Sequence, residues 1–126
     1  MIIKTCDLIG KELDFVVAHL EGIDVDENCY GFDEYGNPCT VYSPSTEWAE
    51  AGPIIEQENI AITSNSFPWF VTEMGWWGHK ENIHTNGPTP QVAAMRCYVQ
   101  SKLGKEVDMG KIYESLQLEI GDTNDD

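Results

Sequence analysis

The stretch TPQVAAMRCYVQSKLGKEV, residues 89–107, contains the clearest helix signal in the chain. Its apolar residues recur at helical spacing and form one stripe, made of Val92, Met95, Val99 and Leu103. Thr89 is suited to cap this helix, Pro90 to fill its first turn and Gly104 to end it. We therefore predict a core-facing helix over 91–103.

A second helix is predicted over 7–21. Its apolar stripe consists of Ile9, Leu13, Val16, Val17 and Leu20. Thr5 or Asp7 can cap its start, and Gly22 is suited to the left-handed residue that ends it.

Short alternating segments predict a small antiparallel sheet. The strands are expected at 23–26 and 39–42, as a hairpin, and at 60–63 and 67–71. Residues 72–90 are predicted to form a long, irregular loop rich in aromatic residues. The fold class that follows is α+β, with two main helices packed on a small antiparallel sheet.

The segment YSPSTEWAEAGPIIEQENI, residues 42–60, places three hydroxyls close together. Ser45 or Thr46 is predicted to cap a short helix that ends at Gly52. Pro53 is predicted to begin a second short helix.

The length of 126 residues fits one domain, expected over 1–121 and followed by a disordered acidic tail at 122–126. No apolar run approaches the ~18 residues of a membrane span. The first residues lack the apolar core and cleavage site of a signal peptide. We therefore expect a cytoplasmic protein of the host cell, with no membrane contact.

The chain is strongly acidic, with 22 Asp and Glu against 7 Lys and Arg and a net charge of −15. No Lys or Arg occurs between Lys11 and Lys80, whereas the segment from Lys80 to Lys111 is slightly basic. This charge argues against direct nucleic-acid binding by the whole molecule. It serves either solubility or the binding of a basic partner, and the basic segment could still hold one small anion.

The residues that could carry chemistry do not form a convincing catalytic set. No Cys-x-x-Cys pair, Walker loop or nucleophile elbow is present. His79 and His84, with Cys29 and Cys39 far away, match a zinc site only weakly, and the four cysteines are expected to be free thiols. We predict no enzyme activity, no cofactor and no metal.

A ligand site is predicted from three groups of residues. Hydroxyls near a helix start can hold phosphate oxygens, Arg96 offers a planar fork for phosphate, and tryptophans offer faces for a base. The predicted site comprises Ser43, Ser45, Thr46, Trp48, Trp76, Trp77 and Arg96. In the alternative, the hydroxyls only cap a helix and Arg96 pairs with an acid such as Glu47 or Glu56.

Three segments together resemble the phage NinX family: LIGKELDFVVAHLEG at 8–22, the segment at 42–60, and the stretch at 89–107. The resemblance implies a bacteriophage or prophage accessory protein and carries no established activity with it.

Two functions from different classes follow. In the first, the protein sequesters a nucleotide-like small molecule, such as a cyclic oligonucleotide or ADP-ribose derivative used as a host immune signal. In the second, its acidic surface binds and blocks a host defence or nucleic-acid-processing protein, as a DNA mimic would. A dimeric scaffold without a ligand is a third option.

Overall fold

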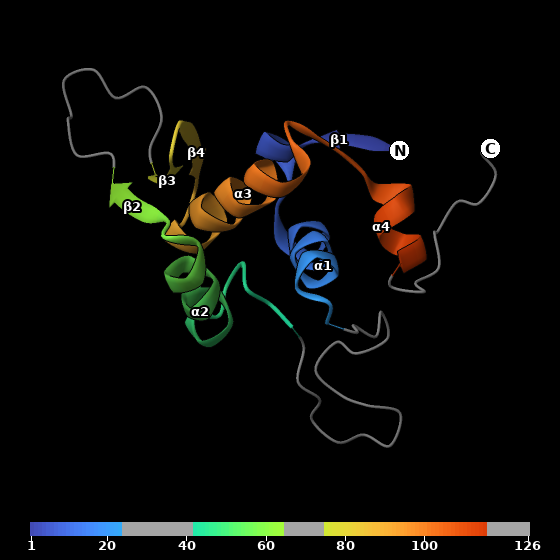
Figure 1. Cartoon of the computed structure of the whole chain (residues 1–126), viewed down its shortest axis with the longest axis horizontal. Helices are drawn as coiled ribbons and strands as arrows, with labels where there is room; N and C mark the ends of the chain where they lie inside the picture. The colour runs from blue at the N-terminus through green and yellow to red at the C-terminus, as the bar shows by residue number, and fades with distance from the viewer. Residues whose placement is uncertain (24–41, 65–74, 116–126) are drawn as a thin grey trace.

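The structure is a computed structural model that describes residues 1–23, 42–64 and 75–115 (Figure 1). Its elements in chain order are β1 (Ile2–Lys4), the 3-10 turn η1 (Thr5–Asp7), α1 (Gly10–Glu21), α2 (Trp48–Glu58), β2 (Ala61–Ser64), β3 (Trp76–Lys80), β4 (Ile83–Gly87), α3 (Pro90–Leu103), β5 (Glu106–Asp108) and α4 (Met109–Ser115). The fold is α+β, as predicted. All but the outer ends of the predicted hairpin at 23–26 and 39–42 lies outside the described residues, as do the strand at 67–71, Cys29, Cys39 and the acidic tail.

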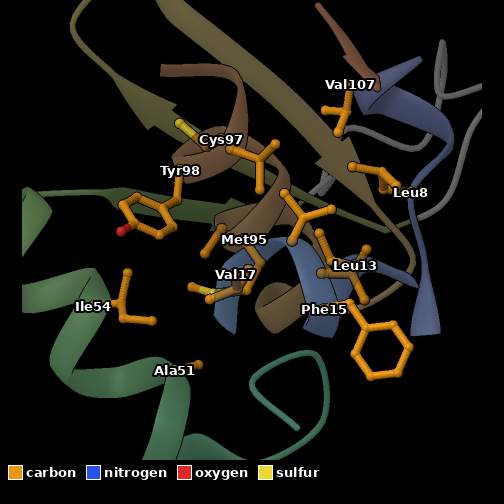
Figure 2. Close-up of a cluster of buried hydrophobic side chains, with 14 of the residues drawn as sticks. Leu8, Leu13, Phe15, Val17, Ala51, Ile54, Met95, Cys97, Tyr98 and Val107 are labelled. Atoms are coloured by element: carbon orange, nitrogen blue, oxygen red, sulfur yellow. The ribbon is translucent and has the colours of Figure 1, made fainter. Parts of the chain in front are cut away.

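Helix α3 runs through the middle of the molecule and is covered on several sides (Figure 1). Every residue from Gln91 to Val99 is buried, because the sheet, α1 and α2 all pack against this helix. Met95 is fully buried in the same cluster as Val17 of α1 and Ile54 of α2 (Figure 2). The buried helix α3 is therefore the centre of the hydrophobic core.

The predicted helix over 91–103 is confirmed, together with its cap. The Thr89 Oγ1 accepts a hydrogen bond from the Val92 N–H at 3.2 Å, and Pro90 occupies the first turn. The predicted apolar stripe holds for three of its four members. Leu103 is 38% exposed, because the helix has passed the edge of the core by its last turn.

The prediction of an irregular loop over 72–90 is wrong for most of that segment. Residues Trp76–Lys80 and Ile83–Gly87 form a hairpin, which pairs with β2 in the antiparallel order β2-β3-β4. Glu81 takes a positive φ of 56° in the two-residue turn, a conformation usually left to Gly, Asn or Asp. The turn therefore lacks its usual sequence signal.

Small residues let the sheet approach α3 closely. A Cβ at Gly78 would lie 2.7 Å from the Ala93 carbonyl oxygen, and one at Gly87 would lie 2.7 Å from the Ala93 nitrogen. Thr85 also donates its hydroxyl hydrogen to the Ala93 carbonyl at 2.8 Å. The backbone of the hairpin therefore rests directly on the backbone of α3.

The start of the first helix differs from the prediction. Helix α1 begins at Gly10 rather than at residue 7, because Thr5–Asp7 form a separate 3-10 turn. Neither Thr5 nor Asp7 caps α1; the residue at its N-cap is Ile9, which has no capping side chain. Gly22 ends the helix in the left-handed conformation, as predicted.

The segment 42–60 forms one helix instead of two. Helix α2 continues through Gly52 and Pro53, and its N-cap is Glu47, which makes no side-chain cap bond. The predicted cap by Ser45 or Thr46 is therefore wrong. The amides of Thr46 and Glu47 donate instead to the Ser43 carbonyl, at 3.0 and 2.8 Å, so a backbone turn satisfies them.

Candidate functional site

A pocket of about 560 Å³ opens where β1, β5, the end of α3 and the β3–β4 turn meet. Its lining consists of Lys4, Cys6, Asn82, His84, Gln100, Lys105 and Glu106. The volume lies within the range of pockets that take small molecules and cofactors. None of the seven predicted ligand residues belongs to this lining.

Thr5 positions one wall of the pocket by joining two distant parts of the chain. Its side chain is fully buried, and its hydroxyl donates to the Gly104 carbonyl at 2.6 Å. Its backbone N–H donates to the Lys105 carbonyl at 2.8 Å. Because β1 and β5 then pair with Lys4 opposite Glu106, the charged groups of both strands reach the same opening.

The β3–β4 hairpin supplies the opposite wall. Its tight turn brings Asn82 and His84 to the pocket. The Nδ1 of His84 lies 2.8 Å from the Nδ1 of His79, and the Nε2 of His79 lies 2.8 Å from the Thr63 hydroxyl oxygen. A hydrogen-bonded chain from β2 through β3 to β4 thus fixes the orientation of the His84 imidazole.

The charge of the lining is opposite to that of the whole molecule. Two lysines and one glutamate leave the lining net positive before His84 is counted, in a chain of net charge −15. Asn82 and Gln100 add amide groups that can donate hydrogen bonds. The slightly basic segment from Lys80 onward signalled part of this set, but Lys4, at the other end of the sequence, did not stand out.

The predicted hydroxyl loop serves the packing of α1 and α2. Ser45 is buried and donates its N–H and its hydroxyl hydrogen to the two oxygens of Asp14, at 2.8 and 3.0 Å. The Ser43 N–H donates to the Glu50 carboxylate at 2.5 Å. The loop lies beside α3, since the Gln91 side-chain amide donates to the Thr46 carbonyl at 3.3 Å.

Arg96 is 8% exposed and joins three elements. Its Nε donates to the Leu8 carbonyl at 2.7 Å and its Nη1 to the Asn86 carbonyl at 2.9 Å. Burial lowers the pKa of Arg96, while Cys6 and Asp7 act in the opposite direction. Among the described residues its hydrogen-bond acceptors are these two carbonyls rather than Glu47 or Glu56.

The three predicted tryptophans lie in two places. Trp48 is 51% exposed on the first turn of α2. Trp76 and Trp77 are partly exposed neighbours on β3, so their side chains leave opposite faces of the sheet. The structure therefore does not gather the tryptophans with Arg96 and the hydroxyl loop around one described pocket.

Asp14 predicts a pH dependence of stability. Burial raises its pKa from 3.8 to about 6; the two Ser45 hydrogen bonds lower it and Glu50 raises it further. In the unfolded chain this carboxyl ionises first, so the unfolded state binds fewer protons between those two values and the free energy of unfolding falls as pH rises. A difference of about two pKa units corresponds to roughly 2–3 kcal/mol, which is present below about pH 4 and is lost as the pH rises to about 6.

The variant Asp14→Asn is therefore expected to match the wild type near pH 4 and to exceed it in stability near pH 7.5. Urea unfolding at the two pH values measures this. Glu114→Gln, at an exposed carboxylate, is the matched control and should change neither value. An Asp14→Asn protein that is less stable than wild type at pH 7.5 would contradict the assignment.

The comparison with known families identifies the chain. The family profile described as "Bacteriophage P22, NinX" matches residues 4–102, which is more than half of the sequence. The chain belongs to the phage NinX family. No curated protein matches the chain.

The NinX match covers most of the described structure, from β1 to the end of α3. It includes five of the seven residues that line the pocket, and ends just before Lys105 and Glu106. No helix among the described residues of this NinX protein is long and apolar enough to cross a membrane.

Proposed function

We propose that this NinX protein binds a small nucleotide-like anion in the pocket lined by Lys4, His84 and Lys105, and sequesters it without turnover. The observation that carries the proposal is a net positive pocket of about 560 Å³ in a chain of net charge −15. Phosphate oxygens accept hydrogen bonds from ammonium and amide groups, which the lining offers together. Counterion screening, with a range of about 8 Å at cellular salt, lets this local charge act despite the acidic remainder.

The phage family supports a role during infection. A protein that withdraws a phosphorylated host immune signal, such as a cyclic oligonucleotide or ADP-ribose derivative, needs affinity and no catalysis. Cys6 and His84 both line the pocket, but the described hydrogen bonds join His84 Nδ1 to His79 and the Cys6 thiol to Asp7. That arrangement favours sequestration over nucleophilic chemistry.

The test begins with a thermal-shift panel of cyclic di- and trinucleotides, ADP-ribose, NAD, mononucleotides and inorganic phosphate. A ligand at 100 times its Kd should add about 2.7 kcal/mol to the free energy of unfolding. Calorimetry of the compounds that shift the wild type then gives Kd values for the variants.

Lys4→Ala and Lys105→Ala are expected to weaken binding about ten- to a hundredfold, since a hydrogen bond to a charged group contributes about 1.5–3 kcal/mol. Lys111→Ala removes an exposed lysine that does not line the pocket and should bind as the wild type does. Unchanged affinity in both pocket variants would refute this location, and a flat panel would refute the proposal for these compounds.

The alternative function rests on the acidic composition. The interval from 12 to 79 has no Lys or Arg, which suits a surface that binds a basic host protein without contacting nucleic acid itself. This interval contains Asp24, Asp26, Asp33 and Glu34, which lie outside the described residues. Reversing them should abolish capture of a host protein, whereas Lys4→Ala and Lys105→Ala should leave that capture unchanged.

A further inference from the structure

Two of the three histidines of the chain face each other on the three-stranded sheet. His79 of β3 pairs directly with His84 of β4, and their Nδ1 atoms lie 2.8 Å apart. The ring centroids are 5.0 Å apart and the rings are inclined by 64°. The sequence alone showed only two histidines five positions apart, and the strand register is what brings them together.

These histidines lie on the face of the sheet that points away from α3. Gly78 and Thr85, which alternate with them along the strands, are the residues that meet Ala93 of α3. His84 is exposed and His79 is partly exposed, so an ion in solution can reach both rings.

The separation of the two Nδ1 atoms suits a shared metal ion. Imidazole nitrogens bind late transition metals at about 2.0 Å, and two such ligands at a right angle are about 2.8 Å apart. Tetrahedral zinc needs a slightly wider angle, which a small rotation of the exposed rings provides. Cu²⁺ and Ni²⁺, which favour right-angled nitrogen ligands, fit the observed separation directly.

Thr63 supplies the partner that such a site requires. A metal on Nδ1 of His79 places the ring proton on Nε2, which lies 2.8 Å from the Thr63 hydroxyl oxygen. The hydroxyl can accept that hydrogen bond, so Thr63 can stabilise the His79 tautomer that binds metal. In the metal-free pair, the two Nδ1 atoms share one proton. When the ion binds, this proton moves to the Nε2 of His84 or to solvent.

We propose that the Nδ1 atoms of His79 and His84 bind one divalent late transition metal ion, with Thr63 as the second-sphere partner of His79. Within the described ranges no set of three His, Cys, Asp or Glu residues gathers to hold a metal, so the proposal assigns two protein ligands from these ranges. The expected order of affinity is Cu²⁺ above Ni²⁺ and Zn²⁺. This site goes beyond the proposed anion binding and does not depend on it.

In the experiment, the full chain is titrated with Ni²⁺ in a phosphate-free buffer, and calorimetry measures the binding. A parallel Zn²⁺ titration follows the histidine ring nitrogens by NMR. Wild type should bind one Ni²⁺ per chain, and Zn²⁺ should shift the ring signals of His79 and His84. His79→Gln and His84→Gln should each weaken Ni²⁺ binding at least about tenfold, within the range known for perturbed metal sites.

His19→Gln is the matched control, because it removes the third histidine, on α1, and should bind Ni²⁺ as the wild type does. Thr63→Val should weaken binding by a smaller factor while leaving the fold unchanged. Equal Ni²⁺ affinity in wild type and both histidine variants, or the absence of any histidine shift with Zn²⁺, would overturn the proposal. Because no anion is present, either outcome leaves the test of the lysine pocket separate.

Discussion

Gly78→Ala is expected to destabilise the protein by about 2–3 kcal/mol or more, the cost of overpacking a rigid interior site. The added Cβ would lie 2.7 Å from the carbonyl oxygen of Ala93, 3.0 Å from its carbonyl carbon and 3.1 Å from the Cα of Ala94. All three atoms belong to the backbone of α3, so no side-chain rotation relieves the contact. The hairpin and the helix must move apart instead.

The matched control is Gly52→Ala in α2. A Cβ at Gly52 meets nothing within 4 Å, and its φ is not positive. Alanine favours a helix over glycine by about 0.5–1 kcal/mol, but a Cβ on the helical residue just before Pro53 crowds the proline ring. The two effects oppose each other, so the change in stability should stay within about 1 kcal/mol. Urea unfolding should therefore show a clear loss of stability for Gly78→Ala and only a small change for Gly52→Ala. Tolerance of Gly78→Ala would show that the close approach is misplaced.

Arg96→Met is the second large expected loss, of about 2–4 kcal/mol, since a buried acceptor left without a donor costs about 1–3 kcal/mol. Methionine fills the space of the arginine stem but donates no hydrogen bond. The Leu8 and Asn86 carbonyls would both lose this donor, and the link through Arg96 between the end of η1 and strand β4 would be lost.

Lys102→Met is the control on the same helix. Lys102 lies near the end of α3, where its Nζ is 3.5 Å from Glu58 and its side chain is 44% exposed. An exposed pair of this kind contributes about 1 kcal/mol or less. If unfolding measurements placed Arg96→Met within that same range, Arg96 would not be a structural link.

The structural role of Arg96 makes it a poor position for testing ligand binding. Arg96 was predicted to contact phosphate, so its removal is an obvious first variant. Its two backbone bonds mean that lost binding in an Arg96 variant can follow from lost structure. Lys105→Ala avoids this problem, because Lys105 lines the pocket and its structural hydrogen bond with Thr5 is made by its backbone carbonyl, which alanine keeps.

Local signals in the sequence were enough for α3 and for the end of α1. The cap at Thr89, the proline after it and the apolar period through Val99 act within one or two turns, so they predict α3 without knowledge of its neighbours. Gly22 likewise marks the end of α1 by its own conformational freedom.

Long-range pairing decided the sheet and the sites. The hairpin from Trp76 to Gly87 turns through Glu81, whose side chain signals no turn, and its faces are set by contact with α3. The pocket forms because Thr5 bonds Gly104, a residue 99 positions away. The hydrogen bonds between Ser45 and Asp14 span 31 positions. Because of them, Ser45 is a packing contact and not the predicted helix cap. No local pattern encodes such distances, because they result from the packing of all the elements together.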